Sequence, residues 1–174
     1  MKKIAVFASG RGSNFQAIFA QIKTGNIDAK VVCLISNKPD AHALEYARNN
    51  HIPVFSIDVK SPASTEQMLR ILEDHSVELI VLAGYIKLIP IEIVDQYSNK
   101  IINIHPALLP AFGGKGCYGM NVHKKVLKSG VKFTGVTIHF VNNNYDDGQI
   151  IAQEIVPVLQ DDSPDELAKR VLTT

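Results

Sequence analysis

The feature that most constrains the fold is a regular alternation of short β-rich runs with helical patterns over the first 104 residues. Predicted strands cover residues 4–8, 30–35, 53–57, 79–82 and 100–104, and predicted helices cover 14–23, 41–48, 64–73 and 91–96. In the third helix, Ser64 and Gln67 stand at the spacing of a capping box. Strands that alternate with helices are joined by crossovers, so this pattern predicts a doubly wound, mostly parallel sheet of the α/β class.

The pattern changes after residue 110. A glycine-rich loop at 111–119 precedes a predicted helix at 121–128. Residues 133–141 alternate between apolar and polar side chains, as is typical of a half-exposed antiparallel strand. The turn 142–148 and a strand at 149–156 complete a C-terminal antiparallel hairpin on a Rossmann-like sheet. We therefore expect residues 1–174 to form one domain.

A last helix is predicted to begin at Ser163-Pro164-Asp165-Glu166. This run combines an N-cap residue, a proline at the first helical position and a glutamate at the third. No glycine or proline stop signal follows before residue 174, so we expect part of this helix to be missing from the sequence.

Charge and composition argue against several classes of protein. A net charge of +1 predicts no nucleic-acid partner, and no apolar run approaches the ~20 residues of a membrane span. Two cysteines indicate neither a disulfide framework nor a zinc site, so we expect a reducing cytoplasm. We also expect no metal, because five histidines lack metal-ligand spacing and are interpreted as surface or core residues: His42, His51, His75, His123 and His139.

An amide and an imidazole stand two residues apart at the end of the fifth predicted strand. Every second side chain of a strand points the same way, so Asn103 and His105 share a face about 6.5–7 Å apart. A hydrogen-bond donor beside a group that titrates near neutrality suits chemistry at a carbonyl, where an oxyanion is held and a proton moved. The alternative is two polar residues that cap the strand and bond to nearby backbone.

The segment Ser-Gly-Arg-Gly-Ser-Asn at 9–14 joins the first predicted strand to the first helix. Its glycines allow close approach of a ligand, and the helix N-terminus offers free N–H groups, so this turn predicts an anion site, most naturally for phosphate. Phe15 replaces the third glycine of a dinucleotide fingerprint, and no Walker lysine follows. The alternative is a tight turn in which Ser13 or Asn14 caps the helix.

Two further segments are candidates for function. Asp146-Asp147-Gly148 lies in the hairpin turn, where the alternative is two aspartates that only solvate a loop. In a doubly wound fold this turn would meet the strand ending at His105, and a carboxylate there would orient the imidazole. The segment 83–90 follows the fourth strand. Its residues would line an apolar slot with exposed backbone polar groups, or alternatively fill the core.

Four motifs together resemble the glycinamide ribonucleotide transformylases, which are folate-dependent formyltransferases. The motifs are Gly12-Ser13-Asn14, Asn103-x-His105-Pro-Ala-Leu-Leu-Pro, Gly135-x-Thr137-x-His139-Phe-Val and Asp146-x-Gly148-x-Ile-Ile-x-Gln153. The resemblance covers essentially the whole chain. It implies transfer of a formyl group from 10-formyltetrahydrofolate to the primary amine of glycinamide ribonucleotide in purine biosynthesis, by direct attack and without a metal.

The resemblance also implies roles for individual residues. Asn103, His105 and Asp146 would be catalytic, with Asp146 rather than Asp147 in the matching position. The substrate phosphate would be bound by Gly12, Ser13 and Asn14, and the folate by Ile86, Lys87, Leu88 and Ile89. Two rival hypotheses are hydrolysis of the same formyl donor by water and a non-catalytic module that binds a nucleotide or phosphate through the first turn.

Overall fold

A computed structural model describes residues 1–173. The chain forms two compact units, unit 1 at Met1–Ile102 and unit 2 from Asn103 onward. We describe each unit by itself. Strand β5 (Ile101–His105) contributes its first two residues to unit 1 and its last three to unit 2.

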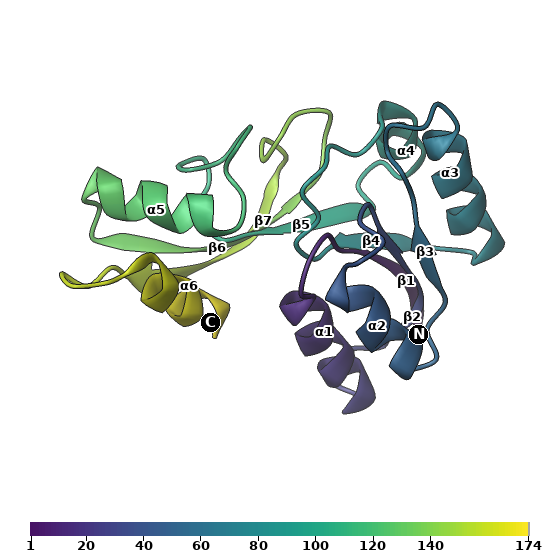
Figure 1. The fold of residues 1–174 in the computed structure, drawn as a ribbon, viewed down its shortest axis with the longest axis horizontal. Helices are drawn as coiled ribbons and strands as arrows, with labels where there is room; N and C mark the ends of the chain where they lie inside the picture. The colour runs from purple at the N-terminus through teal and green to yellow at the C-terminus, as the bar shows by residue number, and fades with distance from the viewer. Residues whose placement is uncertain (174) are drawn as a thin grey trace. The chain divides into compact units, whose positions relative to one another are not determined.

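Unit 1 is a parallel sheet with helices on both faces. Its strands β1 (Lys2–Phe7), β2 (Ala29–Ser36), β3 (Val54–Ser56) and β4 (Leu79–Leu82) are ordered β3-β2-β1-β4, followed by β5. The pairs β1–β2, β1–β4 and β2–β3 are parallel. Helices α1 (Ser13–Lys23) and α2 (His42–Asn49) cover one face, while α3 (Ser64–Asp74) and α4 (Ile91–Gln96) lie on the other (Figure 1). The predicted doubly wound arrangement is therefore confirmed.

The core of unit 1 explains why its strands are continuous apolar runs. Val6 and Leu34, from the two central strands, pack in one buried cluster with Phe15 of α1 and Leu44 of α2. Strands covered on both faces have no solvent side, so they do not alternate with polar residues. Complete burial of Phe15 contributes roughly 1.5–3 kcal/mol relative to an exposed side chain.

Unit 2 is an antiparallel hairpin with two helices. Strands β6 (Phe133–Phe140) and β7 (Ile150–Pro157) pair antiparallel, as predicted, and β6 neighbours β5. Helices α5 (Met120–Ser129) and α6 (Pro164–Leu172) share a buried cluster that includes Val122, Val126, Leu167 and Val171. The predicted capping box at the start of α6 is present: Ser163 Oγ accepts from the Glu166 amide, and the Glu166 carboxylate accepts from the Ser163 amide.

The capping box predicted at the start of α3 is wrong. Ala63 is the N-cap residue, and no side chain caps this helix. The Ser64 amide donates to the Ser61 carbonyl at 3.0 Å, so a preceding turn leads into the helix at the predicted residue, and Ser64 is buried in its first turn. No helix within residues 1–173 is both long enough and apolar enough to span a bilayer.

Candidate active site

Asp146 is the centre of a polar cluster in unit 2. It lies in the turn between β6 and β7, with its side chain only 11% exposed. Its Oδ1 atom is 3.4 Å from His105 Nδ1 and 3.7 Å from His139 Nε2, and it accepts from Asn103 Nδ2 at 3.3 Å. The structure thus brings together the three predicted catalytic residues, Asn103, His105 and Asp146.

His105 is held between two acceptors. This side chain is buried, with Nδ1 facing the Asp146 carboxylate and Nε2 3.0 Å from the Phe112 carbonyl oxygen. Carboxylate and carbonyl oxygens can only accept, so the ring donates at both positions only when it carries two protons. Both ring nitrogens of His105 therefore face hydrogen-bond acceptors, which fixes the orientation of the ring.

Asn103 and His139 form a second contact in the cluster. His139 Nδ1 lies 2.8 Å from the Phe140 carbonyl oxygen, to which only a protonated nitrogen can donate. In the neutral ring Nε2 is then the acceptor, and it receives a hydrogen bond from Asn103 Nδ2 at 3.1 Å. The two amide hydrogens of Asn103 therefore point to His139 and Asp146, which fixes the orientation of this amide.

The glycine-rich loop supplies a main-chain donor. The Gly114 amide donates to Asp146 Oδ2 at 2.9 Å, so both carboxylate oxygens have partners. Gly114 has a φ of +88°, a conformation that glycine adopts without a steric penalty. This backbone conformation lets the amide point at the carboxylate.

The partners of Asp146 determine its charge. Burial by itself would raise the pKa of Asp146, but a hydrogen bond from His105, the charge of His105 and the Gly114 amide together hold that pKa well below its ordinary value of 3.8. The carboxylate is therefore ionised beside His105 at neutral pH. Such a pair can orient an imidazolium and exchange a proton with it.

The hairpin and the segment after β5 hold this cluster in place. Thr137 Oγ1 donates to the Ala107 carbonyl at 2.6 Å and accepts from the Leu109 amide at 3.0 Å. Gln153 Nε2, from the paired strand, donates to Thr137 Oγ1 at 3.0 Å. At Gly148 a Cβ atom would lie 1.8 Å from the Phe140 carbonyl oxygen, so the turn that carries Asp146 requires glycine there.

The predicted phosphate loop lies in unit 1. Gly12 is the N-cap of α1, has a φ of +78°, and leaves no room for a Cβ, which would lie 2.8 Å from Ala43 Cβ. No side chain caps α1 and no acidic residue lies in its first turn, so the alternative in which Ser13 or Asn14 caps the helix is wrong. Both residues lie inside the first turn instead, where the positive end of the helix is uncompensated.

The predicted folate-binding residues, 86–89, also lie in unit 1. Part of this segment fills the core and part of it is exposed, so both alternatives hold in part. Ile89 is buried and so fills the core, whereas Leu88 is 44% exposed and Lys87 is exposed. Gly84 has a φ of +78°, in the left-handed region that favours glycine. The segment thus presents Lys87 and Leu88 on a backbone anchored by Ile89.

Three contributors to the cluster, Thr137, His139 and Gly114, were assigned no role from the sequence. Thr137 and His139 share one face of β6, and both are buried, whereas the alternating apolar residues of this strand are only half-buried. In this strand the polar side chains are therefore buried and the apolar ones partly exposed, the reverse of the usual pattern. The sequence alone does not show this, because the partners of the polar side chains come from other segments. Gly114 acts through its amide, for which the residue type gives no direct signal.

Comparison with known proteins assigns the family. The pattern of the family described as formyl transferase matches residues 2–174. The chain therefore belongs to the formyl transferase family.

Its relatives define a narrower group. The chain is 51% identical to a phosphoribosylglycinamide formyltransferase, named chloroplastic, from Arabidopsis thaliana, over 98% of this chain; it spans 60% of that relative's length. It is 43% identical to the Bacillus subtilis phosphoribosylglycinamide formyltransferase, over 98% of this chain and 87% of that one. A crystal structure of the Bacillus halodurans enzyme of the same name matches with a TM-score of 0.92 at 36% identity, over 99% and 88% of the two chains. The resemblance seen in the sequence is thereby confirmed.

Proposed function

We propose that this protein transfers a formyl group from 10-formyltetrahydrofolate to the primary amine of glycinamide ribonucleotide. The observation that carries the proposal is the cluster in which Asn103 and His105 both contact the ionised Asp146. An amide donor, an imidazole and a carboxylate at one point are the groups that acyl transfer between two nitrogens requires. The family and the names of the relatives support the same activity.

The reaction would proceed by direct attack. The amine nitrogen of the ribonucleotide bonds to the formyl carbon, and the carbonyl electron pair moves to oxygen. Asn103 Nδ2 and protonated His105 would then donate hydrogen bonds to this oxyanion. The new bond of Asn103 would replace its 3.3 Å contact with Asp146. Collapse of the intermediate breaks the bond to N10 of the folate, and the proton lost by the amine reaches N10 with the help of Asp146 and His105.

The proposal assigns substrate contacts to unit 1. The free N–H groups at the start of α1, at Gly12, Ser13 and Asn14, would hold the ribonucleotide phosphate. The absence of any side-chain cap or first-turn acid on that helix supports this role. Residues 86–89 would hold the folate, with exposed Leu88 offering an apolar contact.

A two-substrate assay tests the proposed function. Purified protein is mixed with 10-formyltetrahydrofolate, with and without glycinamide ribonucleotide, and tetrahydrofolate and formylated ribonucleotide are both quantified. We expect tetrahydrofolate to appear only with the ribonucleotide and in equal amount to the formylated product. Release of tetrahydrofolate and formate without the ribonucleotide would identify a hydrolase instead. No turnover, with phosphate binding retained, would identify a binding module.

The cellular location also belongs to the proposal. Cys33 and Cys117 are both unpaired and buried, which agrees with a reducing compartment. We propose the cytoplasm. The Arabidopsis relative is named chloroplastic, so localisation of the tagged protein in its own cell is the direct test.

A further inference from the structure

We propose that Ser9 is a positioning residue that fixes the main chain of the segment 84–89 and thereby sets the affinity for the formyl donor. This inference rests on the proposed function, because it assumes that residues 86–89 bind the folate. The observation that motivates it is a buried hydroxyl group at the end of β1 whose hydrogen bonds reach the segment after β4 and the turn after β2.

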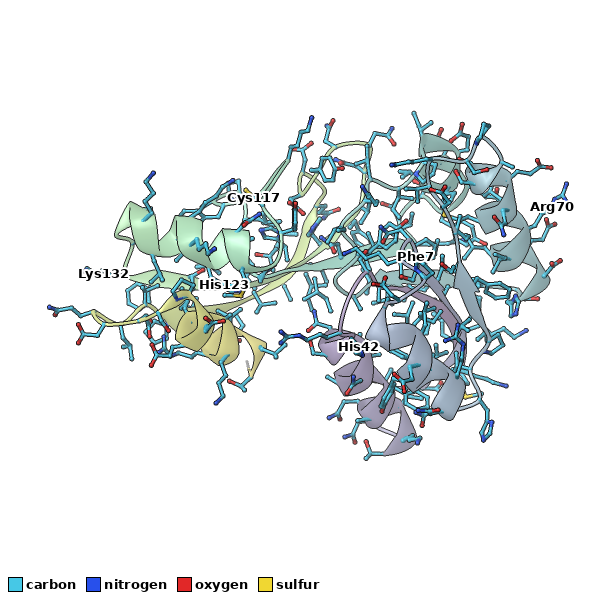
Figure 2. The ribbon with its side chains drawn as sticks, in the orientation of Figure 1. Phe7, His42, Arg70, Cys117, His123 and Lys132 are labelled. Carbon is cyan, nitrogen blue, oxygen red and sulfur yellow. The ribbon has the colours of Figure 1, made fainter. Side chains whose placement is uncertain are left out.

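Ser9 holds the segment by two separate bonds. Its amide donates to the Gly84 carbonyl at 3.1 Å, and its Oγ accepts from the Ile86 amide at 3.0 Å. The two bonds bracket Tyr85, whose ring packs edge-on against buried Phe7 with 5.4 Å between centroids (Phe7 is labelled in Figure 2). The backbone entering the folate segment is therefore anchored on both sides of one aromatic residue.

The direction of the hydroxyl group is also fixed. Ser9 Oγ donates its hydrogen to Asn37 Oδ1 at 2.5 Å, in the turn that follows β2. With its hydrogen committed to Asn37, the oxygen presents its lone pairs to the Ile86 amide. Asn37, in the turn after β2, thus orients the hydroxyl of Ser9, after β1, toward the Ile86 amide in the segment after β4.

The consequence concerns binding rather than chemistry. A pterin recognised by backbone polar groups depends on where that backbone lies, and a small displacement weakens several hydrogen bonds together. Replacement of Ser9 by alanine would remove the Ile86 contact but keep the main-chain bond to Gly84. It would leave Asn103, His105 and Asp146 unaltered, because none of them contacts Ser9 in any hydrogen bond described here. The effect should therefore appear in donor affinity and leave kcat nearly intact.

The test compares Ser9→Ala with Ser64→Ala. Ser64 is also a buried serine, and its side chain does not cap α3, so the control removes a buried hydroxyl that bonds neither Ser9 nor Asn37 nor the segment. Calorimetric titration with tetrahydrofolate should give a dissociation constant about tenfold higher for Ser9→Ala than for wild type. The KM for 10-formyltetrahydrofolate should rise by a similar factor, while kcat stays within about twofold.

Hydrogen exchange provides a readout that does not depend on activity. The Ile86 amide should exchange about tenfold faster in Ser9→Ala than in wild type or Ser64→Ala, because it has lost its acceptor. Wild-type exchange and wild-type affinity in Ser9→Ala would overturn the inference. So would equal losses in both serine variants, which would indicate general destabilisation. Failure of the proposed function is distinguishable, because it would appear as wild-type protein without formyl transfer to the ribonucleotide.

Discussion

Asn103 is the residue whose substitution should affect the proposed reaction most directly. Asn103→Ala removes a donor for the oxyanion, and loss of one such donor costs on the order of 10²–10³ in rate. We expect kcat to fall by this factor while tetrahydrofolate binding, measured by titration, changes little. Asn142→Ala is the matched control, since its amide contacts Asp147 rather than Asp146. Wild-type kcat in Asn103→Ala would contradict the assignment.

The adjacent aspartates offer an internal comparison. Asp146 contacts His105 and the Gly114 amide, whereas Asp147 Oδ2 accepts only from the side chains of Asn142 and Asn144 in the bonds described. Asp146→Asn should lower kcat at least about 100-fold, because the neutral amide no longer stabilises the imidazolium of His105. Asp147→Asn should stay within about threefold of wild type. Steady-state kinetics on both variants would reject the assignment if their order were reversed.

At the scale of the element, the turn between β6 and β7 is the structure on which Asp146 depends. A methyl group at Gly148 would lie 1.8 Å from the Phe140 carbonyl oxygen, so the turn must move. Gly148→Ala should lower the free energy of unfolding by about 1–3 kcal/mol, measured by urea denaturation, and should also reduce kcat. Gly130→Ala is the control: its Cβ meets open space, so any cost of its positive φ should leave kcat unchanged. Equal kcat in both variants would argue against the turn's role.

The elements themselves were largely predictable, and the exceptions have physical causes. Strands such as 79–82 and the helix 91–96 have the predicted bounds, because apolar runs and periodicity are local signals. The cap predicted at Ser64 failed because a preceding turn competed for the helix start. His139 was classed as a surface or core histidine because its partners, Asn103 and Asp146, come from other parts of the chain.

At the scale of the whole molecule, acid should weaken the fold in two stages. Burial, and then the charge of His105, lower the pKa of His123 below its ordinary 6.5; the side chain lies on α5 (Figure 2). Below pH 6.5, His123 is therefore protonated more readily in the unfolded chain than in the folded one. The free energy of unfolding falls as pH drops below 6.5. Asp146 has a lowered pKa as well, so its contribution is present above 3.8 and is lost at lower pH.

His123→Gln should isolate the first stage. Glutamine does not titrate, so the decrease in the free energy of unfolding between about pH 7 and about pH 5 should be smaller than in wild type. Urea denaturation at both pH values measures this difference. His42→Gln removes an exposed imidazole on α2 and serves as the control. An identical change of pH dependence in the two variants would show that burial of His123 is not its cause.

The bond from the Gly114 amide to Asp146 has a consequence for how the determinants of the proposed activity are mapped. Saturation mutagenesis exchanges side chains and leaves every peptide N–H in place except at proline, so a loss of activity on substitution of Gly114 would report the strain of its positive φ rather than the loss of the donor. Replacement of the peptide N–H of Gly114 by an ester oxygen would remove this donor alone. The resulting change in activity would measure a contribution that no exchange of side chains can isolate. Inhibitor design faces the same asymmetry, since a compound that engages this peptide group could not readily be evaded by a change of side chain.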